Sequence, residues 1–369
     1  MKILEITSGQ FVNGALVHVD LLTRQLIQRG HEVHLLCRPR SWIWRKLHRT
    51  GINKRKSEMH RFPPDELWRI AKWIEAEKFD VIHTHMSRAH FFGVLLKGMT
   101  GVPCVATAHT SLFQLHWRLN DLVIANSDST AWFNRHINRV PQNRLITIPC
   151  FIDLDRFRAV DPQRRQKIRH ELTLRGNQPA IGIVGAVTPR KGQLELVAAL
   201  PQLLMQFPDL KVLFIGQFNK SCRYYAKIRR SLFEKKLYRR VIWVGRRNNV
   251  HELIQALDLL VVPSLKEPLG LCALEAMAAS IPVVASHRGG LKEFVIPEKT
   301  GLLFNPNNPA QIADAVARGL TDVPWRQHVI ANAHQMLLDR FTPSAITSQI
   351  ESALESVISP KATRHSSPK

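Results

Sequence analysis

The sequence predicts an α/β protein built from two doubly wound parallel sheets, one in each half of the chain. Short, continuously apolar runs such as Ile3–Ile6 and Leu259–Val262 alternate with segments of helical periodicity. This alternation is typical of buried parallel strands joined by crossover helices. After an irregular segment, Cys150–Pro162, the series starts again at Ala180–Val184. A length of 369 residues is ample for two such domains.

Composition narrows the class of protein further. The net charge of +23 is large for a metabolic enzyme and suggests a polyanionic neighbour such as nucleic acid, an anionic membrane or a phosphorylated acceptor. Five scattered cysteines without C-x-x-C spacing argue against a disulfide framework or a zinc site. Neither a signal peptide nor a run of about 18 apolar residues is evident, so we expect the cytoplasm.

The first half opens with a strand, a loop through Asn13-Gly14, a helix that ends near Gly30, and a second strand. This βαβ unit carries a glycine at the strand end where doubly wound sheets bind ligands, but it has no G-x-G-x-x-G fingerprint. The strands expected in this half are Ile3–Ile6, Val33–Cys37, Asp80–His83, Pro103–Ala106, Leu122–Ala125 and Leu145–Ile148.

The segment Arg38–Arg61 departs from this rhythm because it is strongly basic and contains tryptophans. Such a segment is suited to an anionic membrane surface, and basic residues with aromatics also bind single-stranded nucleic acid. The alternative is a solvated loop that supports a small local core. The residues expected to contact membrane or acceptor are Arg40, Trp42, Trp44, Arg45 and Lys46.

Three histidines lie at the carboxyl ends of predicted strands: His83, His85 and His109. A histidine there can contact a ligand or manage a proton, although a lone histidine is more often structural. His83 and His85 are two apart in a strand and point the same way. They lack an obvious third metal ligand in the sequence, so no metal site is predicted.

In the second half, the strand Ala180–Val184 precedes a loop that joins a glycine to two adjacent cations. Gly185 allows close approach of a ligand to the backbone, and Arg190 and Lys191 can neutralise a diphosphate. An ordinary basic surface turn is the alternative. The remaining strands are expected at Leu210–Ile215, Val241–Val244, Leu259–Val262, Ile281–Ala285 and Thr300–Phe304.

The stretch Asp258–Gly290 reads as strand, loop, helix and strand. It places Glu267 on the loop and Glu275 about two turns along the helix. The amides near Gly270 and Leu271 lie at the open start of that helix, where a phosphate binds well. A nucleotide sugar needs carboxylates for its hydroxyl groups and donors for its diphosphate. Equally, Glu275 could form a structural salt bridge while Glu267 is solvated.

Together these segments resemble the retaining GT-B glycosyltransferases of family 4, which include enzymes of lipopolysaccharide core assembly. The resemblance covers nearly the whole chain. The matching segments are N-G-A-L-V-H-V-D-L-L-T-R-Q-L-I-Q-R-G-H-E-V from Asn13, F-D-V-I-H-T-H from Phe79, V-I-A-N-S-D from Val123, I-P-C-F-I-D-L-D-R-F from Ile148, P-R-K-G from Pro189 and E-P-L-G-L-C-A-L-E-A-M-A from Glu267. The last, with two glutamates separated by seven residues, is the most telling.

The resemblance implies roles for individual residues. Glu275 would bind the donor ribose, and Glu267 the donor sugar, beside the Gly270 and Leu271 amides. Arg190 and Lys191 would bind the diphosphate and stabilise the leaving group, with Gly185 in the same loop. From the other domain, His109 would lie by the reacting sugar. Two further positions complete the implied donor site, Arg246 near the base and Gly14 near the diphosphate.

The sequence departs from the family at several positions. Asn13 stands where a glycine is frequent, which puts the shape of that loop in question. Pro268 and Leu269 replace the frequent Gly-Phe, so the donor sugar is open. The usual Asn-Gly between the domains is Cys150-Phe151.

The resemblance also implies two Rossmann-like domains facing each other across a cleft. The expected parts are an acceptor domain at 1–155, a donor domain at 156–340, a helix at 341–358 that returns to the first domain, and a flexible tail at 359–369. The expected reaction moves a sugar from a nucleoside-diphosphate sugar, with UDP as the expected carrier, to a lipid-linked or lipopolysaccharide-type acceptor. Configuration would be retained, without metal or other cofactor.

This reaction places the enzyme on the inner face of the plasma membrane, as a cytoplasmic, peripheral protein.

Three other interpretations remain. A sugar-nucleotide epimerase would need catalytic carboxylates in the first domain, and none is convincing at its strand ends. A nucleic-acid binder is favoured by charge alone, and binding nucleic acid is not expected beside intact donor motifs. A soluble polysaccharide synthase would not need the basic first domain.

Overall fold

The computed structural model describes residues 1–47, 51–60 and 64–358, and these form two compact units. Unit 1 comprises Met1–Phe151 together with the segment from Pro343, and unit 2 is Ile152–Thr342. Each unit is a parallel sheet with helices on both faces, so the predicted α/β, doubly wound class is confirmed. The expected flexible tail, 359–369, lies outside the described residues.

Unit 1 contains a seven-stranded parallel sheet in the order β3-β2-β1-β4-β5-β6-β7. Alternate residues of β1 face opposite sides, as strand geometry requires. Ile3 packs with helices α1 and α14, whereas Leu4 and Ile6 pack with α3 and α4. The strands are β1 (Lys2–Thr7), β2 (Glu32–Cys37), β3 (Asn53–Lys56), β4 (Val81–His85), β5 (Cys104–Ala108), β6 (Leu122–Ala125) and β7 (Leu145–Thr147).

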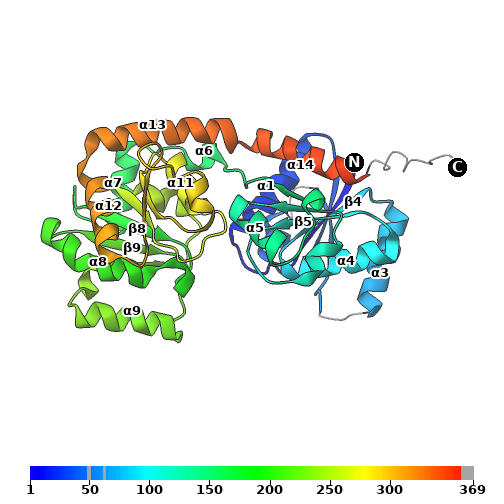
Figure 1. Ribbon diagram of the computed structural model, residues 1–369, viewed down its shortest axis with the longest axis horizontal. Helices are drawn as coiled ribbons and strands as arrows, with labels where there is room; N and C mark the ends of the chain where they lie inside the picture. The colour runs from blue at the N-terminus through cyan, green and yellow to red at the C-terminus, as the bar shows by residue number, and fades with distance from the viewer. Residues whose placement is uncertain (48–50, 61–63, 359–369) are drawn as a thin grey trace. The chain divides into compact units, whose positions relative to one another are not determined.

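The helices of unit 1 include one from the far end of the chain. Helix α14 lies beside α1 (Figure 1), and Arg29 Nε donates to Glu351 Oε2 at 2.7 Å between them. The buried residues Ile346, Ile350 and Leu354 of α14 join the core under the sheet. The helices are α1 (Gly14–Gln28), α2 (Trp42–Lys46), α3 (Pro64–Glu77), α4 (Ser87–Thr100), α5 (Asp128–His136) and α14 (Pro343–Ile358).

The basic segment Arg38–Arg61 contains regular structure that the sequence did not reveal. Its described part holds the short helix α2 and the edge strand β3, which pairs in parallel with β2. Strand β3 contains lysines and an arginine, so it lacks the apolar run by which a buried strand is predicted. Such charges are common on the edge strands of sheets, where they oppose aggregation. Arg49 and Arg61 lie outside the described residues.

Unit 2 contains a six-stranded parallel sheet in the order β10-β9-β8-β11-β12-β13. The strands are β8 (Ala180–Val184), β9 (Lys211–Ile215), β10 (Val241–Gly245), β11 (Leu259–Val262), β12 (Val283–Ser286) and β13 (Leu302–Phe304). The helices are α6 (Leu154–Phe157), α7 (Pro162–Glu171), α8 (Gln193–Gln206), α9 (Arg223–Glu234), α10 (Val250–Gln255), α11 (Leu271–Ala278), α12 (Pro309–Thr321) and α13 (Val323–Arg340). Within the described ranges, every helix is too short or too polar to cross a membrane.

Candidate donor site and a buried histidine cluster

Two loops at the carboxyl edge of the unit 2 sheet are joined to each other. The first follows β8 and carries Arg190 and Lys191, and the second follows β11 and carries Glu267. Lys191 Nζ lies 2.7 Å from Glu267 Oε2, and Arg190 Nη1 lies 3.4 Å from Glu267 Oε1. The Leu265 amide donates to the Arg190 carbonyl at 2.9 Å. The structure thus brings three predicted donor residues together.

Glu267 is an ionised carboxylate held inside this loop pair, with 6% of its surface exposed. Burial raises its pKa, but the charges of Lys191 and Arg190 outweigh burial and leave the pKa below its usual value. Burial likewise lowers the pKa of Lys191, and the Glu267 charge reverses that shift. Ser264 Oγ also donates to Glu267 Oε2 at 2.9 Å. Both groups are therefore charged at neutral pH.

Glycines fix the backbone around Glu267. Gly289 has φ +65°, and a Cβ there would lie 1.8 Å from the Glu267 carbonyl oxygen. Gly270 has φ +102°, and its Cβ would lie 2.5 Å from Leu291 Cδ2. Only glycine fits these positions without rearrangement. Helix α11 starts directly after Gly270 and has no side-chain hydrogen bond at its N-terminus, so its first amides can meet an anion.

Glu275 lies along α11, where it is half-buried. Burial raises the pKa of its carboxyl group to about 7, against the opposing charges of Arg156 and Lys191. Helix α6, which carries Arg156, packs against α11. Hydrogen-bond donors of a ligand, such as ribose hydroxyls, stabilise the ionised form of such a carboxylate. This is the predicted ribose-binding residue.

The other predicted donor residues of unit 2 follow neighbouring strands. Gly185 comes directly after β8 with φ +140°, and its amide donates to the Ile215 carbonyl at 2.8 Å. A Cβ there would lie 3.0 Å from Lys191 Cε. Arg246 follows β10 and, with Arg247, Asn248 and Asn249, lines an open hollow of about 660 Å³.

Gly14 is the first residue of α1 in unit 1, and Asn13 precedes it as the N-cap. Asn13 has extended backbone, and its Oδ1 accepts from the Leu16 amide at 3.0 Å. Asparagine is a strong N-cap for this reason. The departure from glycine at position 13 therefore replaces an open helix start by a capped one.

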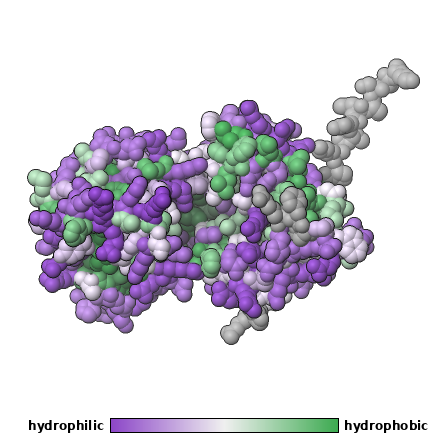
Figure 2. All heavy atoms as spheres, turned by 90° about the horizontal axis from the view of Figure 1, so that it is seen from below, coloured by the Kyte–Doolittle hydropathy of each residue, from purple (hydrophilic) through white to green (hydrophobic). Residues whose placement is uncertain are grey.

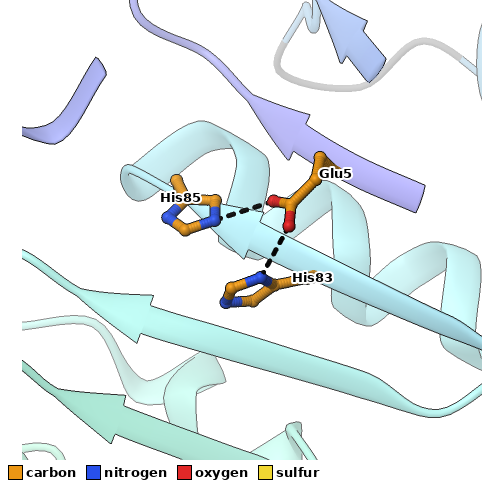
Figure 3. A group of neighbouring side chains, drawn as sticks. All are labelled: Glu5, His83 and His85. Carbon is orange, nitrogen blue, oxygen red and sulfur yellow. Dashed lines mark hydrogen bonds and ion pairs between the residues drawn. The ribbon is translucent and has the colours of Figure 1, made fainter. Parts of the chain in front are cut away.

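A cluster of histidines surrounds a single acid inside unit 1. Figure 3 shows the Glu5 carboxylate of β1 between His83 and His85 of β4. His83 Nδ1 lies 2.9 Å from Glu5 Oε1, and His85 Nε2 lies 2.8 Å from Glu5 Oε2. All three side chains are fully buried. Burial alone raises the pKa of Glu5, but the two histidines hold it far below its usual range.

His109, the predicted residue beside the reacting sugar, extends this cluster. Its Nε2 lies 3.1 Å from His85 Nδ1, and its Nδ1 lies 3.8 Å from Cys150 Sγ. His18 packs edge-on against it, with ring centroids 5.3 Å apart. Burial lowers the pKa of His109 well below its usual value and that of His85 to about 4. Both rings are neutral at pH 7.

Sequence reasoning missed Glu5 and His18. Glu5 interrupts an apolar strand, and an acid inside such a run is the signal that could have found it. His18 lies on the buried side of α1, and neither of its ring nitrogens has a hydrogen-bond partner among the described residues. Glu5 also supplies what the sequence lacked, a third potential metal ligand whose oxygen lies within 4.8 Å of the His83 and His85 nitrogens.

The residues expected to contact a membrane divide into two sets. Trp42 and Trp44 are half-buried against the core under α2, and Lys54 and Lys56 cover the Trp44 ring with Nζ 4.7 and 5.0 Å from its centroid. This packing matches the small local core that was the alternative. Three exposed cations form the other set, Arg40, Arg45 and Lys46.

Comparisons with known proteins address the family and the fold of this chain. Residues 164–336 match the family model "Glycosyl transferases group 1", and residues 12–156 match "Glycosyltransferase Family 4". The N-acetyl-alpha-D-glucosaminyl L-malate synthase of Bacillus anthracis is 26% identical over 96% of both chains. The crystal structure of Anabaena HepE with UDP and glucose has a TM-score of 0.85 and 22% identity, covering 96% of this chain and 100% of that one. WaaG, a glycosyltransferase of lipopolysaccharide biosynthesis, has a TM-score of 0.69 and 18% identity, covering 96% and 99%.

Proposed function

This chain belongs to the group 1 and family 4 glycosyltransferases and has the GT-B fold. From this premise we propose that it transfers a sugar from a UDP-sugar to a lipid-linked or lipopolysaccharide-type acceptor. The donor binds unit 2, and transfer retains configuration without a metal ion. Neither the fold nor the relatives named above favour a sugar-nucleotide epimerase or a nucleic-acid binder.

The observation that carries this proposal is the Lys191–Glu267 pair beside the uncapped start of α11. Negative charge develops on the departing diphosphate, and preorganised cations and amides stabilise it. Arg190 and Lys191 supply the cations, and the amides that follow Gly270 supply donors. Glu267, fixed by Lys191, accepts from sugar hydroxyls. Glu275 accepts from ribose, and Arg246 lies near the base.

UDP is proposed because the structurally similar HepE binds UDP and glucose. The test is thermal unfolding with nucleoside diphosphates and their sugars, with EDTA present throughout. A ligand at about 100 times its Kd stabilises the folded state by about 2.7 kcal/mol. We expect UDP and one UDP-sugar to raise the Tm selectively. A stronger response to GDP or ADP would replace UDP, and no response to any diphosphate would overturn the donor site.

The acceptor proposal is a phosphorylated glycolipid at the inner face of the plasma membrane. Its support is the net charge of +23, the exposed cations Arg40, Arg45 and Lys46, and the likeness to WaaG. Figure 2 shows a largely hydrophilic surface with hydrophobic patches. A small hydroxy acid is the competing acceptor, because the Bacillus anthracis relative is a malate synthase.

Vesicle sedimentation and transfer assays together distinguish a lipid acceptor from a small hydroxy acid. Replacing Arg40, Arg45 and Lys46 by glutamine should weaken binding to phosphatidylserine vesicles by about 1 kcal/mol per cation. The matched control replaces three exposed cations of α9, Arg223, Lys227 and Arg229, which should leave binding nearly unchanged. Equal losses in both variants would indicate that charge alone acts. Transfer to malate but not to lipid extracts would reject the lipid acceptor.

A further inference from the structure

Glu5 determines the hydrogen-bond directions in the buried histidine cluster. An ionised carboxylate only accepts hydrogen bonds, and both Glu5 oxygens face imidazole nitrogens inside the unit 1 sheet (Figure 3). The facing nitrogens must therefore both carry protons. His83 is protonated at Nδ1 and His85 at Nε2.

The rings of His85 and His109 are neutral, because burial lowers the pKa of both. A neutral imidazole has one N–H and one lone pair. His85 donates through Nε2, so its Nδ1 is an acceptor, and that atom lies 3.1 Å from His109 Nε2. His109 must then donate through Nε2 and hold its own lone pair at Nδ1. One buried carboxylate thus determines which nitrogens of His83 and His85 in β4 donate and, through His85, which nitrogen of His109 in the loop after β5 donates.

We propose that Glu5, acting through His85, is a positioning residue that fixes His109 with Nδ1 as a hydrogen-bond acceptor for a hydroxyl group of the sugar substrate. This inference rests on the proposed function and on the family resemblance, which implies a contact between His109 and the sugar. Neither Glu5 nor His85 is among the donor-site residues of unit 2, and the inference gives both a role in orienting His109.

The contacts of His109 leave its Nδ1 with a weak hydrogen-bond partner that a ligand can replace. Its Nδ1 meets the Cys150 thiol at 3.8 Å, and a thiol is a weak donor that a hydroxyl group readily replaces. The rings of His18 and Phe151 pack together, 4.9 Å apart, beside His109. Burial lowers the pKa of His18 to about 3, so it adds no charge that would repel a proton donor.

The hydrogen bond between His83 and Thr107 provides a matched control. His83 Nε2 lies 2.8 Å from Thr107 Oγ1, a contact that involves neither His85 nor His109. Thr107→Val removes a buried hydrogen bond of the same network and keeps the side-chain shape. His85→Gln retains a donor for Glu5 but removes the ring acceptor that holds His109. Both variants disturb the same core, and only the second breaks the link to His109.

The first measurement reads the tautomers without substrate. Side-chain ¹⁵N–¹H spectra of protein labelled on histidine, assigned with His109→Gln, should show wild-type His109 protonated at Nε2. His85→Gln should release it to a tautomer mixture, whereas Thr107→Val should not. Protonation at Nδ1 in the wild type, or an unchanged His109 in His85→Gln, would overturn the proposal.

Glu5→Gln gives an independent variant of similar shape. An amide has one acceptor oxygen and one donor nitrogen, so either His83 or His85 must invert its tautomer. Spectra in which neither ring changes would contradict the hydrogen-bond chain. One equivalent of zinc bound in the purified protein, with His83 Nδ1 and His85 Nε2 unprotonated, would also overturn it, because these atoms would then be ligands.

The second measurement uses transfer kinetics. His85→Gln should lower kcat by about 10- to 100-fold, a loss of the size found when the outer hydrogen-bond partner of a metal-bound histidine is removed. Thr107→Val should stay close to wild type. Equal losses in both would mean a structural role only. If the protein transfers no sugar at all, the proposed function fails, while the spectra still decide whether Glu5 fixes His109.

Discussion

The two units hold their buried acids in different ways. Glu5 lies within a regular strand of unit 1, and imidazoles from the neighbouring strand satisfy both of its oxygens. Glu267 lies in a loop of unit 2, where Lys191 and Ser264 share one oxygen. The first acid is fully enclosed, and the second is at the sheet edge with Arg190 half exposed beside it. We infer that the strand acid sets geometry, whereas the loop acid is available to ligand.

The helix starts differ in the same sense. Asn13 caps α1 in unit 1 with its own side chain, and α11 in unit 2 begins at Gly270 without a side-chain cap. Capping satisfies amides that an anion would otherwise bind. The open start of α11 therefore lies near two cations that are paired with Glu267, Arg190 and Lys191, and the following predictions test that contrast.

The largest effect is expected for Lys191→Met. It removes the cation beside the leaving group and should lower kcat by about 100- to 1,000-fold. It also leaves Glu267 buried without its main partner, which should cost roughly 3 kcal/mol of unfolding free energy. Denaturant unfolding and transfer assays measure both. The double variant with Glu267→Gln should recover stability but not transfer, and recovered transfer would contradict the role of Lys191.

The second prediction compares two glycines with positive φ. Gly289→Ala places a Cβ 1.8 Å from the Glu267 carbonyl oxygen and should distort the loop as well as strain it. Gly30→Ala, at the end of α1, meets nothing within 4 Å and should cost only the strain of about 1–2 kcal/mol. Unfolding free energies should separate the two, and only Gly289→Ala should weaken nucleotide binding. Equal costs would indicate that the loop adapts freely.

The third prediction concerns pH. The Glu275 pKa of about 7 means that its carboxylate protonates between pH 8 and 6. Affinity for a nucleoside-diphosphate sugar, whose diphosphate does not titrate there, should fall by up to about tenfold over that range. Calorimetric titration measures this, and Glu275→Gln should bind weakly at both pH values. Undiminished wild-type affinity at pH 6 would argue against a ribose contact.

The same carboxyl group predicts a gain in stability. Its folded pKa lies above the unfolded value of 4.5, so its ionisation costs stability as the pH rises from about 4.5 through 7. Glu275→Gln should therefore be more stable than wild type at pH 8, by about 1–3 kcal/mol after allowing for partial exposure. The difference should vanish near pH 4. A less stable variant at pH 8 would contradict the burial cost.

The smallest effect is expected at Asn13. Asn13→Ala should cost about 1 kcal/mol through loss of the α1 cap, and Asn13→Gly only a few tenths. Urea unfolding checks both values. If Asn13→Gly were also to strengthen diphosphate binding, the cap at α1 would be shown to compete with the ligand.

Sequence reasoning placed three proposed donor residues on one strand–loop–helix unit because they are local in the chain. Glu267, Gly270 and Glu275 lie within nine positions, and a strand–loop–helix pattern fixes their relation. The strand β3 was missed since its residues are charged. For Trp42 and Trp44 the sequence left a membrane surface and a small local core open, and the structure places both side chains half-buried against such a core. Periodicity reports which residues could be buried, and it does not report which neighbour will cover them.

The sequence alone determined the two-sheet architecture, the family, and the positions of Arg190, Lys191, Glu267 and Glu275. These follow from patterns within short segments, where backbone geometry is local. Only the tertiary structure decided that Lys191 pairs with Glu267, and that Glu5 meets two histidines 78 and 80 positions away. Parallel strands align residues that are remote in the chain. The hydrogen-bond partners of the single acid in β1 therefore come from β4 and cannot be identified from β1 alone.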